Sequence, residues 1–386
     1  MNHFIRITLA SIILLAATSP ARASFTVDTI VNSDATQIAS AYVYVPTFGL
    51  ELHRVVYRDG DTHELKMASS IKTTGAWSAW YISTIAPETA HTPAIEISKE
   101  DGTTFIAYQD GDGDLMLAYL EICLPLANCP GLQQVPIDQG TTRGQYPSLT
   151  LVYNDNGELD QIHTAAIEGD PQAIQTNSAR VRHSYCDSWP NCESNNDWTS
   201  ADAPMGKPGP YKTAIGNDHS GINGSPLVRI LATMGDGVRM TTWSIYGPSY
   251  SNSTTLLTTR RGHLSYGGFN TTGRQLTIAT GTDVYFLSGL NSFGTAELVS
   301  ASGQGGAFSD VTFDSNDFHV VAFNRDTNDD VIIGRRHLSG SSWSRISIPD
   351  AGSVGRYVTV HEDQDRDLLI VYRDGTNDRI RIARGD

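Results

Sequence analysis

The stretch DVTFDSNDFHVVAFNRDTNDDVIIGRRHLSGSSWSRISIP, residues 310–349, has the pattern of four short β-strands. Its strand-like runs are 310–313, 318–323, 331–334 and 343–348, and each is rich in β-branched or aromatic residues. Asp, Asn, Gly and Ser gather between the runs, where turns are expected. The stretch therefore predicts one antiparallel unit of four strands.

Other parts of the chain repeat this unit. The hairpin between its second and third strands recurs at 55–68, 106–118 and 370–383, and an apolar residue followed five places later by Ile marks fourth strands at Trp80, Leu132 and Trp343. First strands are expected to begin near Ile38, Ala94, Ser148, Thr213, Tyr266, Asp310 and Val358. Seven units of about 52 residues without sustained helical periodicity predict an all-β, seven-bladed β-propeller of four-stranded antiparallel blades.

The two ends of the repeated region complement each other. Residues 25–30, FTVDTI, match a fourth strand that no third strand precedes, and residues 379–383 form a third strand that no fourth strand follows. A closed ring removes the unpaired edges of an open array. We therefore predict that residues 25–31 pair with residues 380–384 and close the ring.

The first residues have the pattern of an export signal. Arg6 precedes a mostly apolar run, residues 7–17, and ARA at 21–23 is a small-x-small cleavage site. The run is shorter than the roughly 20 residues that cross a bilayer, and no other run is long enough. We expect a signal peptide at 1–23, a single propeller domain at 24–386, and an exported protein, periplasmic or secreted, that is not an integral membrane protein.

The charge balance limits the possible partners. The 386 residues include 27 basic and 42 acidic ones, a formal net charge of −15. Removal of residues 1–23 takes away Arg6 and Arg22, which leaves 25 basic residues against 42 acidic ones, a net charge of −17. Such a surface repels phosphate backbones, so nucleic acid is excluded as a partner.

The four cysteines form two pairs of equal spacing, Cys123 with Cys129 and Cys186 with Cys192. In an exported protein this pattern predicts two local disulfides. A single zinc site of four thiolates is the alternative. The oxidising compartment and the absence of the short C-x₂-C spacing favour the disulfides.

One blade carries a resemblance to a known family. PAIEI at 93–97, DG at 101–102, FIAY at 105–108 and DLMLA at 114–118 resemble the repeats of secreted bacterial sialidase-like (BNR-like) propellers. The chain lacks the Asp-box Ser-x-Asp-x-Gly-x-x-Trp of that family, and no arginine triad with a Tyr/Glu nucleophile pair can be placed in it. The resemblance implies the fold and an exported protein, and it does not imply sialidase activity.

Six loops that lead into first strands align around a glycine or its equivalent: 90–93, 143–146, 208–211, 261–264, 305–308 and 354–357. The residue after it varies between blades: His91, Gln145, Pro210, His263, Ala307 and Arg356. Polar and aromatic residues that converge at the mouth of a channel suit a sugar. We predict ligand-binding residues there, with solvated loop residues as the alternative: His91, Gln145, Tyr146, Tyr211, His263, Arg356 and Tyr357. Among them, His263 and Arg356 best suit an acidic sugar.

The turn DGDGD at 110–114 places three carboxylates, Asp110, Asp112 and Asp114, at alternate positions. Such an arrangement suits a structural Ca²⁺ ion. The alternative is a hairpin turn rich in Asp and Gly, which needs no metal.

Histidines recur within the strands. His53, His163 and His319 occupy second strands near one repeat register, which indicates a structural role. His183 occupies a third strand where other blades carry apolar residues. An imidazole there needs a polar partner, either as a core histidine or in a functional site.

Three functions fit these patterns, and a carbohydrate-binding propeller with its ligand site at the channel mouth is favoured. One alternative is a polysaccharide-cleaving enzyme, a lyase or glycoside hydrolase acting on an acidic glycan, which requires acid and base side chains in one pocket. The other is a cell-surface protein-interaction scaffold, which requires a broad exposed apolar patch. The residues leave catalysis open.

Overall fold

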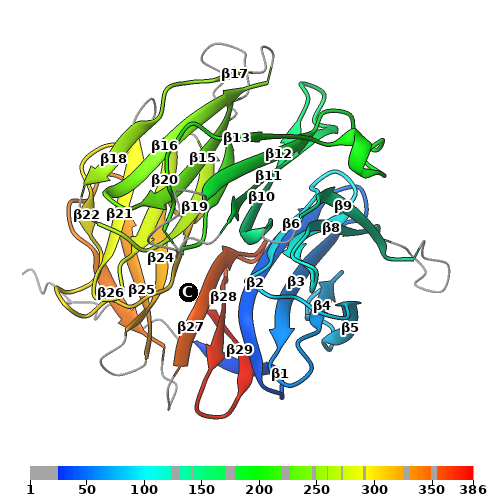
Figure 1. Cartoon of the computed structure of the whole chain (residues 1–386). Coiled ribbons are helices and arrows are strands. Elements are labelled where there is room, and N and C mark those ends of the chain that lie inside the picture. The colour runs from blue at the N-terminus through cyan, green and yellow to red at the C-terminus, as the bar shows by residue number, and fades with distance from the viewer. Residues whose placement is uncertain are drawn as a thin grey trace, which may run out of the picture.

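Seven antiparallel sheets stand around a common centre like the blades of a propeller (Figure 1). This computed structural model describes residues 25–122, 131–140, 143–169, 179–209, 211–218, 227–245, 249–258, 260–270, 273–289, 293–325, 330–348 and 354–385. Apart from one 3₁₀ turn, η2 (Asn195–Asp197), all regular elements in these ranges are strands. None of the described segments forms a helix of the length and apolar character that a membrane span requires. The predicted all-β, seven-bladed fold is confirmed.

Each blade begins with its innermost strand, which starts within four residues of the predicted position. The innermost strands are β2 (Ala35–Val45), β6 (Ala94–Ile97), β10 (Gln145–Tyr153), β14 (Ala214–Asp218), β19 (His263–Asn270), β23 (Ser309–Phe313) and β27 (Val354–Glu362). The second strands are β3 (Leu50–Asp59), β7 (Thr104–Gln109), β11 (Leu159–Glu168), β15 (Leu227–Met234), β20 (Gly273–Ala279), β24 (Phe318–Arg325) and β28 (Leu368–Asp374).

The chain then moves outward in each blade. The third strands are β4 (Leu65–Lys72), β8 (Leu115–Leu120), β12 (Arg180–Cys186), β16 (Gly237–Ser244), β21 (Val284–Gly289), β25 (Asp330–His337) and β29 (Arg379–Gly385). Five blades end on β5 (Tyr81–Ala86), β9 (Gln133–Asp138), β13 (Thr199–Asp202), β22 (Glu297–Leu298) and β26 (Ser344–Ser347). Blade 4 departs from the repeat, because two short strands, β17 (Ser249–Tyr250) and β18 (Thr254–Thr258), both pair with β16.

The N-terminal strand completes the last blade. β1 (Thr26–Val31) pairs antiparallel with β29, with Thr26 opposite Arg384 and Val31 opposite Ile380. In Figure 1 the blue strand β1 accordingly lies beside the red strand β29. Blade 7 therefore takes three strands from one end of the chain and one from the other, as predicted, and the ring is closed.

The buried core lies between the blades rather than inside any one of them. Seven clusters of buried apolar side chains occur among the described residues, and each joins two neighbouring blades. At the closure, Val31 and Tyr57 pack with Val371 and Ile382. Full burial of one such aliphatic side chain contributes about 1.5–3 kcal/mol, so each blade depends on both of its neighbours.

The histidines that recur in the second strands lie in this core. His53, His163 and His319 lie in second strands and are buried among aromatic rings. His183 finds its polar partners there as well, because its Nε2 lies 3.0 Å from Nδ1 of His163 and its Nδ1 lies 3.2 Å from the hydroxyl of Tyr250. Burial lowers the pKa of His183 to about 3, so the ring stays neutral. It is a core histidine with satisfied hydrogen bonds.

One of the two predicted disulfides is present. Cys186, at the end of β12, is bonded to Cys192 in the following loop. This bond occupies two of the four thiols that the alternative zinc site would need. Cys123 and Cys129 lie outside the described residues, and their disulfide stays a prediction.

The packing of β1 at the closure predicts that two substitutions in this strand differ in their effect on stability. Val31→Asp places a carboxylate among apolar side chains at a position that is 3% exposed, and should destabilise the protein by about 3–5 kcal/mol. Thr29→Asp, at an exposed position of the same strand, should cost little. Equilibrium denaturation of both variants measures the difference, and equal stability would contradict a packed closure.

The cysteine pattern predicts that peptide mapping without reduction finds two linked pairs, Cys123–Cys129 and Cys186–Cys192. Replacement of both Cys186 and Cys192 by Ser should lower the free energy of unfolding by about 2 kcal/mol, because a short loop is no longer closed in the unfolded chain. Free thiols at Cys123 and Cys129, with stoichiometric zinc, would contradict the second pair.

Candidate functional site

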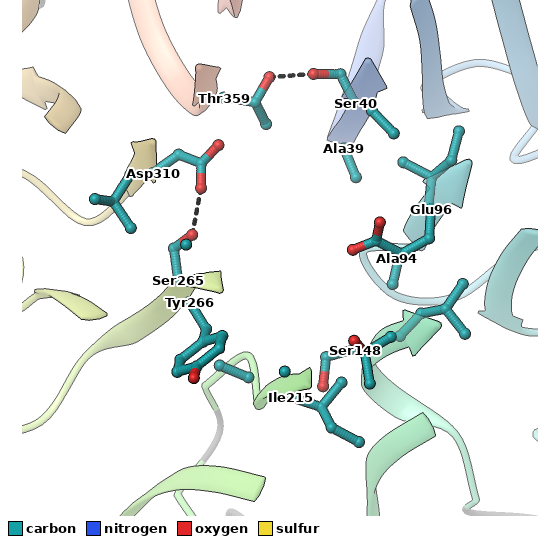
Figure 2. Close-up of a pocket in the computed structure, with 18 of the residues that line it drawn as sticks. Ala39, Ser40, Ala94, Glu96, Ser148, Ile215, Ser265, Tyr266, Asp310 and Thr359 are labelled. Atoms are coloured by element: carbon teal, nitrogen blue, oxygen red, sulfur yellow. Dashed lines mark hydrogen bonds between the residues drawn. The ribbon is translucent and has the colours of Figure 1, made fainter. Parts of the chain in front are cut away.

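The innermost strands of all seven blades enclose a cavity of about 350 Å³ at the centre of the ring. Figure 2 shows this cavity, with Glu96 and Asp310 directed into it from opposite sides. Hydroxyl groups line it as well, among them those of Ser148, Ser265 and Thr359. Because every blade contributes a strand to its wall, this cavity is the central channel of the propeller.

The chain bends sharply where three of the loops lead into innermost strands. Gln37, Tyr146 and Tyr357 have φ angles of 56°, 48° and 55°, a left-handed conformation that residues other than glycine rarely adopt. The pairing register shifts across the same positions in β2, β10 and β27. Bulges of this kind redirect side chains at the ends of strands. Three blades therefore present the equivalent side chain at the same end of the channel.

Aromatic side chains at this end of the channel contact one another around the ring. The ring centroids lie 4.5 Å apart for His91 and Tyr146, and 5.6 Å apart for Tyr211 and His263. Phe308 lies 4.9 Å from His263 and 4.3 Å from Tyr357. We call these six residues the collar: His91, Tyr146, Tyr211, His263, Phe308 and Tyr357. Each is partly exposed, and five of the six are predicted ligand-binding residues.

The two remaining predicted residues adjoin the collar in sequence. Gln145 begins β10, where it pairs with Ile167 of β11. Arg356 lies in β27 opposite Arg373, and its side chain is outside the described part of the structure. The role of Arg356 as a carboxylate ligand therefore stays a prediction.

Four ionisable side chains inside the channel were not predicted from the sequence. Glu96, Lys212, Asp310 and His361 all line the cavity. They lie in innermost strands or shortly before one, whereas the predicted ligand-binding residues belong to the loops that lead into these strands. A charged residue within an otherwise apolar inner strand, as in AIEI at 94–97, is the signal that could have identified them.

Hydrogen bonds hold two of these groups in the channel wall. The hydroxyl of Ser265 donates to Oδ1 of Asp310, and the backbone N–H of Val360 donates to Oδ2 over 2.9 Å. Nε2 of His361 lies 2.9 Å from the hydroxyl of Ser40, which lies 2.5 Å from the hydroxyl of Thr359. Blades 5, 6, 7 and 1 are thus connected around the channel.

Glu96 and Lys212 have no such partners: within the described residues, neither the Glu96 carboxylate nor the Lys212 ammonium makes a hydrogen bond or an ion pair. Burial raises the pKa of Glu96 to about 7, an effect that Lys212 counteracts and Asp310 reinforces. Burial also lowers the pKa of Lys212, and the two carboxylates oppose that change. The channel therefore holds one carboxylate that titrates near neutral pH.

Burial also determines the charge of His263 at neutral pH. Enclosure, together with the nearby ammonium of Lys212, lowers the pKa of His263 to about 4. At neutral pH the ring is uncharged, and its Nδ1 lies 3.4 Å from the backbone N–H of Lys212. It offers a ligand hydrogen bonds and an aromatic face rather than positive charge. Among the predicted ligand-binding residues, Arg356 alone would supply a positive charge for an acidic sugar.

A second cavity, of about 480 Å³, adjoins one collar residue. Tyr211 lines it together with Lys207, Arg239 and Arg261. Arg239 is paired with the exposed carboxylate of Asp236, at an N···O distance of 2.6 Å. This cavity is mainly cationic, in contrast to the channel, which carries two carboxylates and one ammonium.

The predicted calcium ligands form a hairpin turn. Oδ1 of Asp110 accepts hydrogen bonds from the backbone N–H groups of Asp112 and Asp114, and Oδ1 of Asp114 accepts one from Gly140. Asp59, Asp314, Asp363 and Asp374 accept backbone hydrogen bonds in the same way in other blades. Among the described residues, no three His, Cys, Asp or Glu side chains are grouped to hold a metal. Calcium binding at the turn stays a prediction.

No protein-family model matches the chain, and no curated protein matches its sequence. Solved structures match its fold. The Dos1 propeller has a TM-score of 0.53 at 9% identity, over 92% of this chain and 93% of that one. The fucose-specific lectin from Aleuria aurantia has a TM-score of 0.50 at 14% identity, over 82% of this chain and 96% of that one. The K499G mutant of the NanB sialidase from Streptococcus pneumoniae has a TM-score of 0.49 at 10% identity, over 92% of this chain and 70% of that one.

The matches to the Dos1 propeller and to the Aleuria aurantia lectin show a shared propeller fold, and at identities of 9% and 14% they show the fold alone. A lectin propeller occurs among the structures that share it. A shared fold does not determine what the chain binds.

The pKa of Glu96 predicts a pH effect on stability. Between its ordinary value of 4.5 and about 7, the unfolded chain loses the proton that the folded chain keeps, so stability falls as the pH rises through this range. Glu96→Gln should remove this loss, so that the free energy of unfolding of the variant rises by about 1–2 kcal/mol relative to the wild type between pH 5 and pH 8. Water in the channel screens the carboxylate and keeps the difference below the full effect of the pKa shift. Denaturation at both pH values measures it.

Glu88→Gln, at an exposed position, is the matched control and should leave the pH profile unchanged. A Glu96→Gln profile that runs parallel to the wild type would show that Glu96 titrates normally in the folded protein.

Proposed function

We propose that this chain is an exported carbohydrate-binding β-propeller whose ligand site lies at the mouth of the central channel. The collar carries the proposal, since it places aromatic rings from six blades, in two contacting groups, at one end of a polar cavity. Aromatic faces stack against the C–H face of a sugar, while hydroxyl and carboxylate groups below them can bind its hydroxyls.

The strained backbone supports the same location. A positive φ at Tyr146 and Tyr357 costs of order 1–3 kcal/mol at each position. Such strain gathers at binding sites, where the fold holds a side chain in a position that the local sequence does not prefer. The rings of Tyr146 and Tyr357 are thereby fixed before a ligand arrives, which reduces the entropy lost on binding.

A polysaccharide-cleaving enzyme is the second candidate, and one observation favours it. Glu96 has its pKa raised to about 7, which suits a general acid or base at neutral pH. The release of reducing ends or unsaturated products from polysaccharides distinguishes an enzyme from a lectin. In an enzyme, Glu96→Gln would stop turnover and largely spare binding.

The collar predicts the effect of two matched substitutions. Tyr146→Ala should weaken glycan binding about tenfold, because a stacking surface is lost. Tyr81→Ala removes the same side chain from the outer strand β5, where it is 73% exposed, and should leave affinity unchanged. A glycan array on the wild type identifies the ligand, and calorimetry on the three proteins measures the affinities.

Tyr146→Phe should retain most of the affinity, since the ring stays in place. Equal affinity in Tyr146→Ala and the wild type would place the glycan site away from the collar. An array on which no glycan binds would contradict carbohydrate binding altogether.

A further inference from the structure

The channel below the collar receives charged side chains from three alternate blades. Glu96 comes from β6 in blade 2, Lys212 stands just before β14 in blade 4, and Asp310 belongs to β23 in blade 6. All three line the cavity of about 350 Å³. Each also influences the ionisation of another across the channel, since Glu96 is subject to the fields of both Lys212 and Asp310.

Of the two carboxylates, Glu96 is the one that a ligand can use. Asp310 already accepts hydrogen bonds from Ser265 and from the backbone of Val360. The Glu96 carboxylate accepts none from any described residue, although it is directed into the cavity (Figure 2). A carboxylate held in a partly dry channel without a partner gains stability when a cation or a hydrogen-bond donor reaches it.

The charges of the channel favour a cation. The carboxyl groups of Asp310 and Glu96 face one ammonium there, and a cation that reaches Glu96 favours its ionised form. The burial of His361 lowers its pKa, which keeps the imidazole neutral. The chain as a whole carries a net charge of −15, so the long-range field acts in the same direction. The volume lies near the lower end of the range for small-molecule sites, which suits a single sugar residue rather than an extended chain.

We propose that the channel binds the protonated amino group of an amino sugar, with Glu96 as its carboxylate partner. The proposal rests on the carbohydrate binding proposed above and adds the charge of the ligand. The sugar ring lies against the collar, and its ammonium group reaches the channel and donates hydrogen bonds to Glu96. The ammonium of Lys212 repels the ammonium of the sugar, so the channel disfavours a ligand with more than one positive charge.

Glucosamine oligosaccharides and N-acetylglucosamine oligosaccharides of equal length provide the test. Acetylation removes the positive charge and keeps the rest of the ring. At pH 7, calorimetry on the purified protein should show about tenfold tighter binding of the glucosamine form. Glu96→Gln should abolish this preference. Lys212→Gln should increase it by about threefold, because a like charge is removed.

The opposite effects expected for the two variants, a loss of the preference in Glu96→Gln and an increase in Lys212→Gln, separate this proposal from other outcomes. Equal binding of both oligosaccharides, or a preference that survives in Glu96→Gln, would overturn it, and the latter would indicate general attraction to an acidic surface. Weaker binding of the glucosamine form in Lys212→Gln would overturn it as well. Glu88→Gln is the control for loss of an exposed carboxylate and should match the wild type.

Failure of this proposal can be distinguished from failure of carbohydrate binding. If neither oligosaccharide binds but a neutral or acidic glycan does, and Tyr146→Ala weakens that binding, the amino-sugar proposal is wrong and the collar site stands. If no glycan of any charge binds, both proposals are wrong.

Discussion

The pairing of β1 with β29 is the contact on which the rest of the structure depends. The apolar clusters of the described residues lie between neighbouring blades, so a blade without a neighbour exposes a face that no other part of its own sheet can cover. Only a closed ring gives every blade two neighbours. The last blade is completed by a strand from the other end of the chain, so closure also joins the two ends of the described chain and covers the edge of β29.

Closure at seven blades also creates the channel. Seven innermost strands surround the axis, and their small side chains, such as Ala39, Ala94 and Ser148, leave a cavity rather than a packed core. The loops that lead into these strands are brought to one end of the axis by the same arrangement. The bulges at Tyr146 and Tyr357 then direct aromatic rings toward one another there. The collar is thus a consequence of the ring.

The ionisable groups of this protein divide into two kinds. Asp110, Asp314 and Asp363 accept hydrogen bonds from the backbone of their own turns, and His163 and His183 satisfy each other inside the core. The hydrogen bonds of these side chains stabilise the fold. Glu96 and Lys212 have no hydrogen bond or ion pair to any described residue. Keeping them in the channel costs stability, because burial disfavours both charges. Buried ionisable groups without a structural partner are the residues on which the two proposals for this channel rest.

The sequence by itself determined the strands, the number of blades, the closure and most of the collar. Each of these follows from local signals: alternating apolar residues, Asp and Gly turns, unmatched strands at the two ends, and loops aligned in one register. The tertiary structure alone decided that Glu96, Lys212 and Asp310 share one cavity and that His263 is neutral. These residues are far apart in the chain, and only the curvature of the closed ring brings their inner strands to a common axis. Their ionisation depends on burial, which local sequence does not specify.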